Sequence, residues 1–148
     1  MQVQQFSDLP LSKDVLRGIK ALGFEKPSPI QAQSILPLLE GRDVIGQAQT
    51  GTGKTAAFAI PMIESIDVSD KRVQGIVLAP VRELAIQIAK HISELSRYTG
   101  IKVCPIYGGQ KINKQIKQLK KGVHIVVGTP GRVIDHLNRR TLRLRDVQ

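Results

Sequence analysis

The sequence predicts an α/β fold, with a mostly parallel sheet that helices cover on both faces. Two observations predict it: short apolar runs alternate with helical patterns along the chain, and the run at residues 75–79 is apolar throughout, as in a strand buried on both faces. A third is a loop rich in glycine and threonine that separates an apolar run from a helical pattern. Ligands of such sheets bind at the carboxyl ends of the strands, so we expect functional loops there.

The amino-terminal part of the chain predicts two helices. The first covers residues 8–22 and has Ser12 as its amino-terminal cap. The second begins at Ser28-Pro29, a capping residue followed by proline in the first helical turn. Pro37 is expected to bend or end this second helix, because proline cannot donate a helical hydrogen bond.

The remaining elements alternate between strands and helices. Residues 42–46 carry a short apolar run, expected to be a strand that leads into the glycine-rich loop. Further strands are expected at residues 75–79, 102–107 and 123–128, and helices at residues 54–66, 83–98 and 111–121. The last helix carries lysines on the side opposite its apolar residues, which favours a solvated surface.

Length and composition indicate one soluble globular domain. The chain has 148 residues, of which 41% are hydrophobic and 23% charged. No apolar run approaches the roughly 20 residues of a membrane span, and the polar start of the chain lacks the apolar core of a signal peptide. We therefore expect a cytoplasmic protein without membrane contact. Cys104 is the only cysteine, so no internal disulfide forms, and a buried, inert thiol is expected.

The charge balance points to an anionic partner. Lys and Arg number 22 against 12 Asp and Glu, which gives a formal net charge of +10 and an isoelectric point near 10.1. Such a balance attracts polyanions without distinguishing RNA, DNA, nucleotides or an anionic membrane surface. Aromatic residues make up only 3% of the chain, which leaves little for a base-stacking platform. The composition favours contact with a nucleic-acid backbone over contact with bases.

Residues 48–55 have the pattern of a phosphate-binding loop, because they follow an apolar run and open a helical pattern. Glycines let the backbone wrap a phosphate chain, Lys54 reaches its outer phosphates, and the Thr55 hydroxyl can ligate Mg²⁺. The expected nucleotide-binding residues are Ala48, Gln49, Thr50, Gly51, Thr52, Gly53, Lys54 and Thr55. Lys54 and Thr55 are the expected catalytic residues. The alternative is an ordinary turn with a solvated lysine.

Magnesium is expected to arrive with the nucleotide, since the sequence has no cluster of His, Cys and carboxylates with the spacing of a metal site. His91, His124 and His136 are scattered along the chain, and packing or surface positions are expected for them. Ala48 stands at the position where the loop pattern usually has its first glycine, which removes some backbone freedom and leaves the rest of the pattern intact.

A second segment of the sequence also bears on nucleotide binding. Residues 23–31 read Gly-Phe-Glu-Lys-Pro-Ser-Pro-Ile-Gln, and Phe6 lies 17 residues before them. With the phosphate loop, they resemble the Q motif and upstream aromatic of DEAD-box ATP-dependent RNA helicases, in the N-terminal RecA-like domain. The resemblance implies ATP as the nucleotide, with Phe6 stacked on adenine, Gln31 bonded to its edge and Phe24 in the same site. Taken alone, Gln31 would be read as a helix-surface residue.

Three more segments are similar to RNA-binding motifs of that family. Residues 80–85, Pro-Val-Arg-Glu-Leu-Ala, resemble motif Ia, with valine where the family usually has threonine; Gly108-Gly109 resembles the GG motif, and residues 129–132 resemble motif Ib. The resemblance implies that these loops hold the RNA sugar-phosphate backbone, with little sequence preference. The residues concerned are Pro80, Arg82, Gly108, Gly109, Thr129, Pro130, Gly131 and Arg132. Plain turns are the alternative for each glycine pair or corner taken alone.

The resemblance covers residues 1–148 as a partial RecA-like domain, with a Q-motif region at 1–41 and a P-loop core at 42–148. It implies that the Asp-Glu-Ala-Asp strand, the Ser-Ala-Thr strand and a second RecA-like domain lie outside this sequence, as partners of it. We expect the intact protein to hydrolyse ATP with Mg while unwinding short RNA duplexes, and this chain alone to bind nucleotide without turnover. The alternatives are another P-loop ATPase, such as a DNA helicase, or a non-catalytic module that binds RNA or a helicase.

Overall fold

The computed structural model describes residues 3–148 and divides the chain into two compact units. The first unit runs up to Ser65 and includes Glu94–Gly100, and the second consists of Ile66–Ser93 and Ile101–Gln148. The glycine-rich loop lies in the first unit, and the segments that resemble RNA-binding motifs lie in the second. The assignment of residues 1–148 to one domain stays a prediction.

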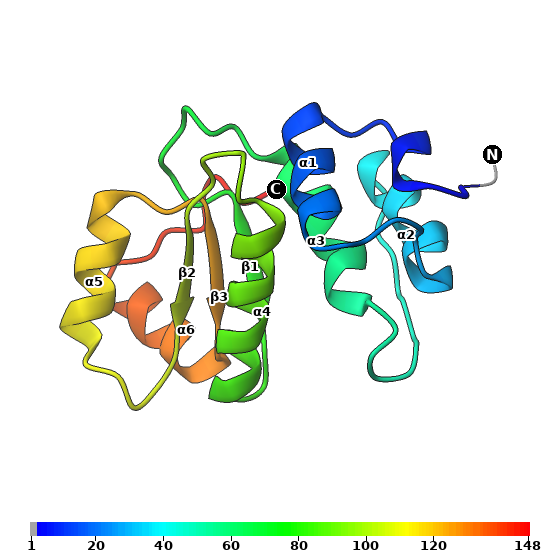
Figure 1. Ribbon diagram of the computed structural model, residues 1–148. Coiled ribbons are helices and arrows are strands. Elements are labelled where there is room, and N and C mark those ends of the chain that lie inside the picture. The colour runs from blue at the N-terminus through cyan, green and yellow to red at the C-terminus, as the bar shows by residue number, and fades with distance from the viewer. Residues whose placement is uncertain (1–2) are drawn as a thin grey trace. The chain divides into compact units, whose positions relative to one another are not determined.

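The first unit is helical. Its elements are the short 3₁₀ helix η1 (Phe6–Asp8) and the helices α1 (Lys13–Ala21), α2 (Pro29–Leu39) and α3 (Lys54–Ser65), of which α2 and α3 pack together (Figure 1). The helix predicted from residue 8 begins only at Lys13, because the Ser12 hydroxyl caps it by accepting the Val15 N–H at 3.4 Å. Pro37 does not end α2, because the last turn still closes: the Glu40 N–H donates to the Leu36 carbonyl at 3.0 Å.

The strand predicted at residues 42–46 is absent, which corrects the sequence interpretation. Residues 42–49 form neither helix nor strand, and the Ile45 side chain is fully exposed, at 102% of its reference area. A strand satisfies its backbone groups only by pairing with a neighbour, and no strand within residues 3–148 pairs with this segment. The run is apolar, but an apolar composition does not by itself provide a neighbouring strand to pair with.

The second unit contains a parallel sheet of three strands in the order β1-β3-β2, as predicted for the fold class. The strands are β1 (Gly75–Leu78), β2 (Val103–Ile106) and β3 (Ile125–Gly128). Val126 in the middle of β3 is paired with Ile76 on one side and Cys104 on the other. All four residues of β3 are buried. The expectation of a strand buried on both faces, made for residues 75–79, is wrong for β1, where Ile76 and Val77 are half-buried and Leu78 is 59% exposed.

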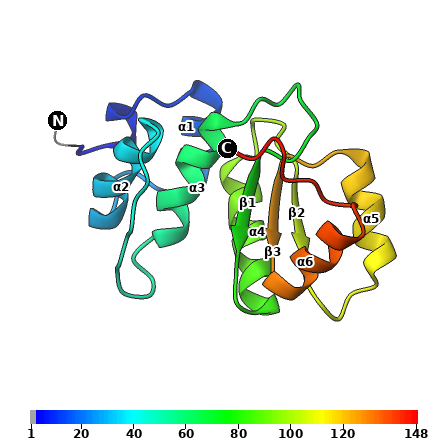
Figure 2. The same cartoon turned by 180° about the vertical axis from the view of Figure 1, so that it is seen from behind.

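Helices cover both faces of this sheet, as predicted. The helices are α4 (Arg82–Leu95), α5 (Ile112–Lys121) and α6 (Pro130–Asn138), and the part of α4 within the second unit lies on the face opposite α6 (Figures 1 and 2). Leu119 of α5 and Leu137 of α6 pack against a buried cluster on one face. The cluster consists of Cys104, Ile106, Val123, Val126, Val133 and Leu142.

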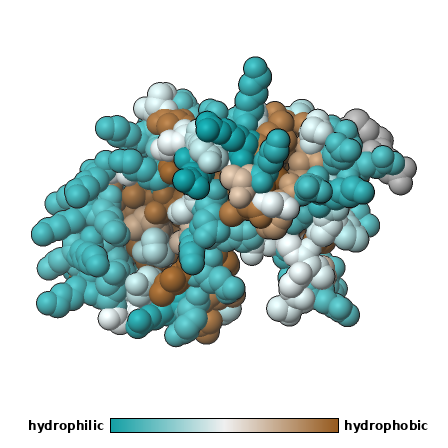
Figure 3. Space-filling model, viewed as in Figure 1, coloured by the Kyte–Doolittle hydropathy of each residue, from teal (hydrophilic) through white to brown (hydrophobic). Residues whose placement is uncertain are grey.

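The surface and the buried thiol follow the sequence expectations. Hydrophilic side chains cover α5, where the predicted lysine face lies (Figure 3). Cys104 is buried, and burial raises the pKa of its thiol to about 11, so the thiol stays protonated and unreactive at neutral pH. Among the helices of residues 3–148, none combines the length and the apolar character needed to cross a membrane.

Candidate functional site

The glycine-rich loop has the backbone geometry of a phosphate cradle. Residues 50–52 form turns and a bend, and α3 begins at Lys54. Gly51 and Gly53 have φ angles of 81° and 86°, a left-handed conformation that costs other residues free energy. The first amide groups of α3 have no partner within the helix, so they and the helix dipole favour an anion at this end.

Lys54 folds back over the loop. Its ammonium group donates to the carbonyl oxygen of Ala48 at 2.8 Å, and the Thr52 hydroxyl donates to the carbonyl oxygen of Gln49 at 2.6 Å. Lys54 also lines a cavity of about 330 Å³ between α2 and α3, together with Phe58. Thr55 follows in the first turn of α3 and is half-buried. The ammonium group of Lys54, which is predicted to reach phosphates, therefore lies against the backbone of the loop.

Gln31 connects α2 to this loop. Its side chain is 5% exposed, its amide nitrogen donates to the carbonyl oxygen of Gly53 at 3.1 Å, and its amide oxygen accepts the Ser28 N–H at 2.9 Å. The alternative interpretation of Gln31 as a solvated surface residue is therefore wrong. One further donor and one acceptor position of the amide remain for a ligand.

Phe6 and Phe24 line one cavity together, and neither lines the cavity that Lys54 lines. Both line a second cavity of about 330 Å³ in the first unit, with Leu16 and Ile19. Phe6 is 4% exposed and belongs to η1. Gln31 is not among the residues that line this cavity. The structure thus brings the two aromatic residues together and keeps Gln31 on the phosphate-loop side.

The predicted RNA-binding segments of the second unit meet at one edge of the sheet. They form three segments after the carboxyl ends of the strands, at residues 80–82, 107–110 and 129–132, which we call the strand-end loops. The first runs into α4 at Arg82, and the third includes the first turn of α6. The Arg82 guanidinium lies 5.3 Å from the centre of the Tyr107 ring, and a Cβ placed on Gly109 would lie 3.0 Å from Arg82 Nη1.

The glycines of these loops leave open space. Gly108, Gly109, Pro130 and Gly131 are exposed, and a Cβ added at Gly108 or Gly131 would meet no atom within 4 Å. Pro130 begins α6, so the amide groups of its first turn face the same edge. Exposed amides at a helix start are suited to phosphate oxygens.

Arg132 has a role within the protein. Its side chain is 15% exposed, and Nη1 donates to the Gln110 carbonyl oxygen at 3.0 Å and to Gln115 Oε1 at 3.1 Å. The arginine therefore fixes the loop after β2 to the start of α6. An RNA contact by Arg132 would use its remaining N–H groups.

Sequence reasoning missed the buried polar network behind Arg132. Gln115 and His136 are each 0% exposed. The Gln115 amide nitrogen donates to the Tyr107 carbonyl oxygen at 3.0 Å and to Gln110 Oε1 at 2.9 Å, so its Oε1 is the acceptor for His136 Nε2 at 2.9 Å. His136 Nδ1 then accepts the Thr141 hydroxyl at 2.7 Å. The network ties two of the strand-end loops to α5.

One signal in the sequence could have revealed it. Gln115 lies three residues after Ile112 and four before Leu119, which places it on the apolar face of the helix predicted at 111–121. A polar residue at a core-facing position is buried and needs hydrogen-bond partners.

His136 makes the stability of the second unit depend on pH. Burial and the neighbouring Arg132 lower its pKa, Arg139 adds to the effect, and Asp135 opposes it. Below the unfolded pKa of about 6.5, the unfolded chain binds a proton that the folded protein does not, so stability falls as pH decreases. We expect His136→Gln to cost about 1 to 3 kcal/mol at pH 7, and the difference from the unsubstituted protein to shrink towards pH 5. Urea unfolding at both pH values measures this, and a difference independent of pH would contradict the neutral histidine.

Metal ligands from the protein alone are not found in the described part of the chain: no three of its His, Cys, Asp and Glu residues group into a metal site. His124 is packed, as predicted, since its Nδ1 accepts the Lys102 N–H at 2.9 Å and its Nε2 lies 3.0 Å from the Val68 carbonyl oxygen.

Comparison with known proteins matches this arrangement to one family. The model of the DEAD/DEAH box helicase family matches residues 28–148. DEAD-box ATP-dependent RNA helicase CshA of Bacillus subtilis (strain 168) is 54% identical over 142 residues, which are 96% of this chain and 29% of that protein. The protein of the same name from Bacillus cereus (strain ATCC 10987) is 52% identical over 143 residues, 97% of this chain and 27% of that protein. The chain thus spans less than a third of the length of these relatives.

Comparison with solved structures leads to the same family. A DEAD box protein from the hyperthermophile Methanococcus jannaschii matches with a TM-score of 0.94 and 46% identity, over 100% of this chain and 40% of that one. A variant of Dbp5 from S. cerevisiae, bound to RNA and ADP BeF3, matches with a TM-score of 0.89 and 38% identity, over 98% of this chain and 37% of that one. The family match covers the phosphate loop, Gln31 and all three strand-end loops. The chain belongs to the DEAD/DEAH box helicase family.

Proposed function

We propose that the protein acts as an ATP-dependent RNA helicase, and that this chain supplies its nucleotide cradle and part of its RNA grip. The observation that carries the proposal is the left-handed Gly51 and Gly53 loop at the start of α3, with the Lys54 ammonium folded over it. The CshA relatives are named ATP-dependent RNA helicases, and the Dbp5 structure contains RNA and ADP BeF3. Both names support the same ligands for this chain.

The nucleotide would be held by its phosphates and its base separately. Loop amides and Lys54 bind the outer phosphates, and Lys54 exchanges its bond to the Ala48 carbonyl for phosphate oxygens. Gln31 can offer its free donor and acceptor to an adenine edge. Stacking of the ring on Phe6, which the family resemblance implies, requires Phe6 to become accessible, because it is 4% exposed and lines a cavity that Gln31 does not line. Because an amide cannot pair the same way with guanine, ATP is preferred over GTP.

Magnesium fits the donor set of this site. Thr55 supplies a hydroxyl in the first turn of α3, and Mg²⁺ commonly takes one or two protein ligands with phosphates and water as the rest. When bound, the ion neutralises charge on the phosphate oxygens. Thr55 would hold it, and Lys54 would stabilise charge that develops on the outer phosphate.

The strand-end loops would hold RNA through its backbone. Arg82 offers a cation, and the exposed amides at Gly108, Gly109 and Gly131 offer donors to phosphate oxygens. Val81, which is 52% exposed beside Arg82, offers an apolar side chain in place of a hydroxyl. Contacts of this kind carry little sequence preference, so binding to many RNA sequences is expected.

Turnover needs more than these residues. Water must be oriented and the developing charge stabilised from a second side, which in phosphoryl transfer usually involves carboxylates and an arginine from another domain. We propose that residues 1–148 form part of a RecA-like ATP-binding domain, that a second RecA-like domain completes the site, and that the protein works in the cytoplasm. The 148-residue chain alone is expected to bind nucleotide with negligible turnover.

The test is ATP hydrolysis and duplex unwinding by the natural full-length protein, with and without RNA. Lys54→Ala is expected to lower the RNA-stimulated rate by at least about 100-fold, because it removes a preorganised cation at the transferred phosphate. Competition by GTP as strong as by ATP would remove the role given to Gln31. RNA binding that ignores ATP, with no hydrolysis, would favour a non-catalytic binding module instead.

A further inference from the structure

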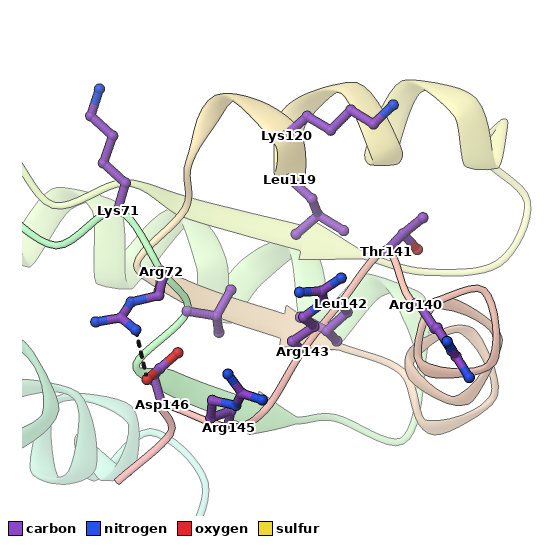
Figure 4. A pocket seen from close by; sticks show the side chains of 11 residues that line it. Lys71, Arg72, Leu119, Lys120, Arg140, Thr141, Leu142, Arg143, Arg145 and Asp146 are labelled. Carbon is purple, nitrogen blue, oxygen red and sulfur yellow. Dashed lines mark ion pairs between the residues drawn. The ribbon is translucent and has the colours of Figure 1, made fainter.

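A strongly basic hollow lies elsewhere in the second unit (Figure 4). This basic pocket has a volume of about 360 Å³, and its apolar lining includes Val73, Leu119 and Leu142. Asp146 is its only carboxylate among the described residues. Six cationic residues line it: Lys71, Arg72, Lys120, Arg140, Arg143 and Arg145. In Figure 4 Arg143 and Arg145 lie near one another, whereas the side chains of Lys71 and Arg140 extend away from the group.

One of the six cations is already neutralised. Arg72 pairs with Asp70 at 2.8 Å and with Asp146 at 3.3 Å, the second pair being drawn in Figure 4. The hydrogen bonds from Arg72 lower the pKa of Asp70 to about 2, so the pair stays charged at neutral pH. These contacts join the segment before β1 to the carboxyl-terminal segment. Arg72 is therefore a structural part of the pocket wall.

The other five cations have no ion-pair partner within residues 3–148. Long side chains of one charge around a shared hollow repel one another, and an anion bound between them relieves that repulsion. Arg140 contributes through its backbone: it is the only residue other than glycine with a left-handed φ, 59°, in the described part of the chain. The chain turns there, and residues 140–146 follow the pocket.

The basic pocket is separate from the strand-end loops. Lys71 precedes β1, and Lys120 lies near the end of α5, which leads into β3, so both mark the amino-terminal end of the sheet. The Lys71 side chain lies beside Gly122, where an added Cβ would be 3.0 Å from Lys71 Cβ. The strand-end loops follow the carboxyl ends of the same strands. Two basic sites thus lie towards opposite ends of one sheet.

The lining indicates phosphate groups as the ligand. Among residues 3–148, no aromatic residue lines the pocket, so bases and nucleosides have nothing there to stack on. Arginine side chains bind phosphate oxygens with two parallel N–H groups, and apolar residues below them support their alkyl stems. Several cations around one hollow suit a ligand that carries more than one phosphate.

We propose that the basic pocket is a second contact for the RNA backbone, which binds phosphates of the strand beyond the segment held by the strand-end loops. The inference rests on the proposed function, because the same unit is taken to bind RNA. It predicts that long single strands bind more tightly than short ones, through two separated sites on this unit.

The test compares two double variants of the natural full-length protein by fluorescence anisotropy, with single-stranded RNA of about 6 and about 20 nucleotides. Arg143→Ala with Arg145→Ala removes two exposed cations from the pocket. We expect at least about 10-fold weaker binding of the long RNA, with a log-log salt slope shallower by about 1.4, since each lost phosphate contact accounts for about 0.7. Affinity for the short RNA should stay within about twofold.

Lys114→Ala with Lys117→Ala is the matched control, because it removes the same charge from exposed positions of α5 outside the pocket. Equal weakening by both pairs would reduce the effect to net charge and overturn the proposal. Unchanged long-RNA binding in the arginine variant, with short RNA still bound, would overturn it and leave the proposed function standing. Failure of the unsubstituted protein to bind either RNA would overturn both.

A small anion is the remaining outcome. Calorimetric titration with inorganic tripolyphosphate, in the unsubstituted protein and the arginine variant, separates it from RNA. If the arginine variant loses tripolyphosphate binding but binds long RNA as tightly as the unsubstituted protein, the pocket binds a free polyphosphate. That result would contradict the RNA contact.

Discussion

Replacing Gly18 by alanine is expected to destabilise the first unit by at least about 3 kcal/mol. A Cβ at this position in α1 would overlap the carbonyl oxygen of Leu95, and the obstacle is backbone, which cannot rotate away. The helices must then separate, or α1 must shift along its axis. Because a small domain is stable by only about 5 to 15 kcal/mol, a large part of its stability is lost.

Urea unfolding of the two proteins measures the effect as a shift of the midpoint to lower urea. Gly131→Ala in α6 is the matched control, since it makes the same change in a helix where an added Cβ meets nothing within 4 Å. Alanine favours a helix over glycine by up to about 1 kcal/mol, so this control should be neutral or slightly more stable. A Gly18→Ala protein as stable as the control would show that the two segments are not packed this closely.

Gly53→Ala is expected to weaken ATP binding by at least about 10-fold, which is about 1.4 kcal/mol. Two effects combine. The left-handed φ of 86° costs alanine about 1 to 2 kcal/mol, and the added Cβ would overlap the Gln31 amide nitrogen, which bonds to the Gly53 carbonyl. The loop must change shape or lose its contact with α2, and either change disturbs the amides that face the phosphates.

Gly51→Ala separates the two effects. Its φ of 81° imposes the same backbone cost, but an added Cβ meets nothing within 4 Å. Titration with a fluorescent ATP analogue should give a lower affinity for the Gly53→Ala protein than for the Gly51→Ala protein. Adding Gln31→Ala to each variant completes the cycle: it relieves the overlap only at residue 53. Equal losses from both glycines, with no coupling to Gln31, would contradict the contact between Gln31 and the loop.

The sequence predicted the parts of this protein that depend on local patterns. The parallel sheet, its covering helices and the tight loop before α3 followed from apolar runs, helical spacing and the positions of Gly51 and Gly53. The binding of phosphates by that loop stays a prediction. The strand predicted at residues 42–46 was wrong, since a strand depends on a pairing partner elsewhere in space. The position of Gln115 on an apolar helix face signals a buried polar residue, but its bonding partner His136 could not be predicted, because that pairing depends on tertiary contacts.

Deuterium labelling of backbone amides would reveal the lack of secondary structure in the segment before the phosphate loop. Its amides carry no strand pairing, so those of residues 43–49 should exchange with solvent almost as fast as in a free peptide, while β3 is protected. Val44 and Ile45 are residues that favour extended backbone, and both side chains are exposed. Any polypeptide that lends a strand to this segment would slow the labelling there first, and the retarded amides would identify the residues that take up the pairing.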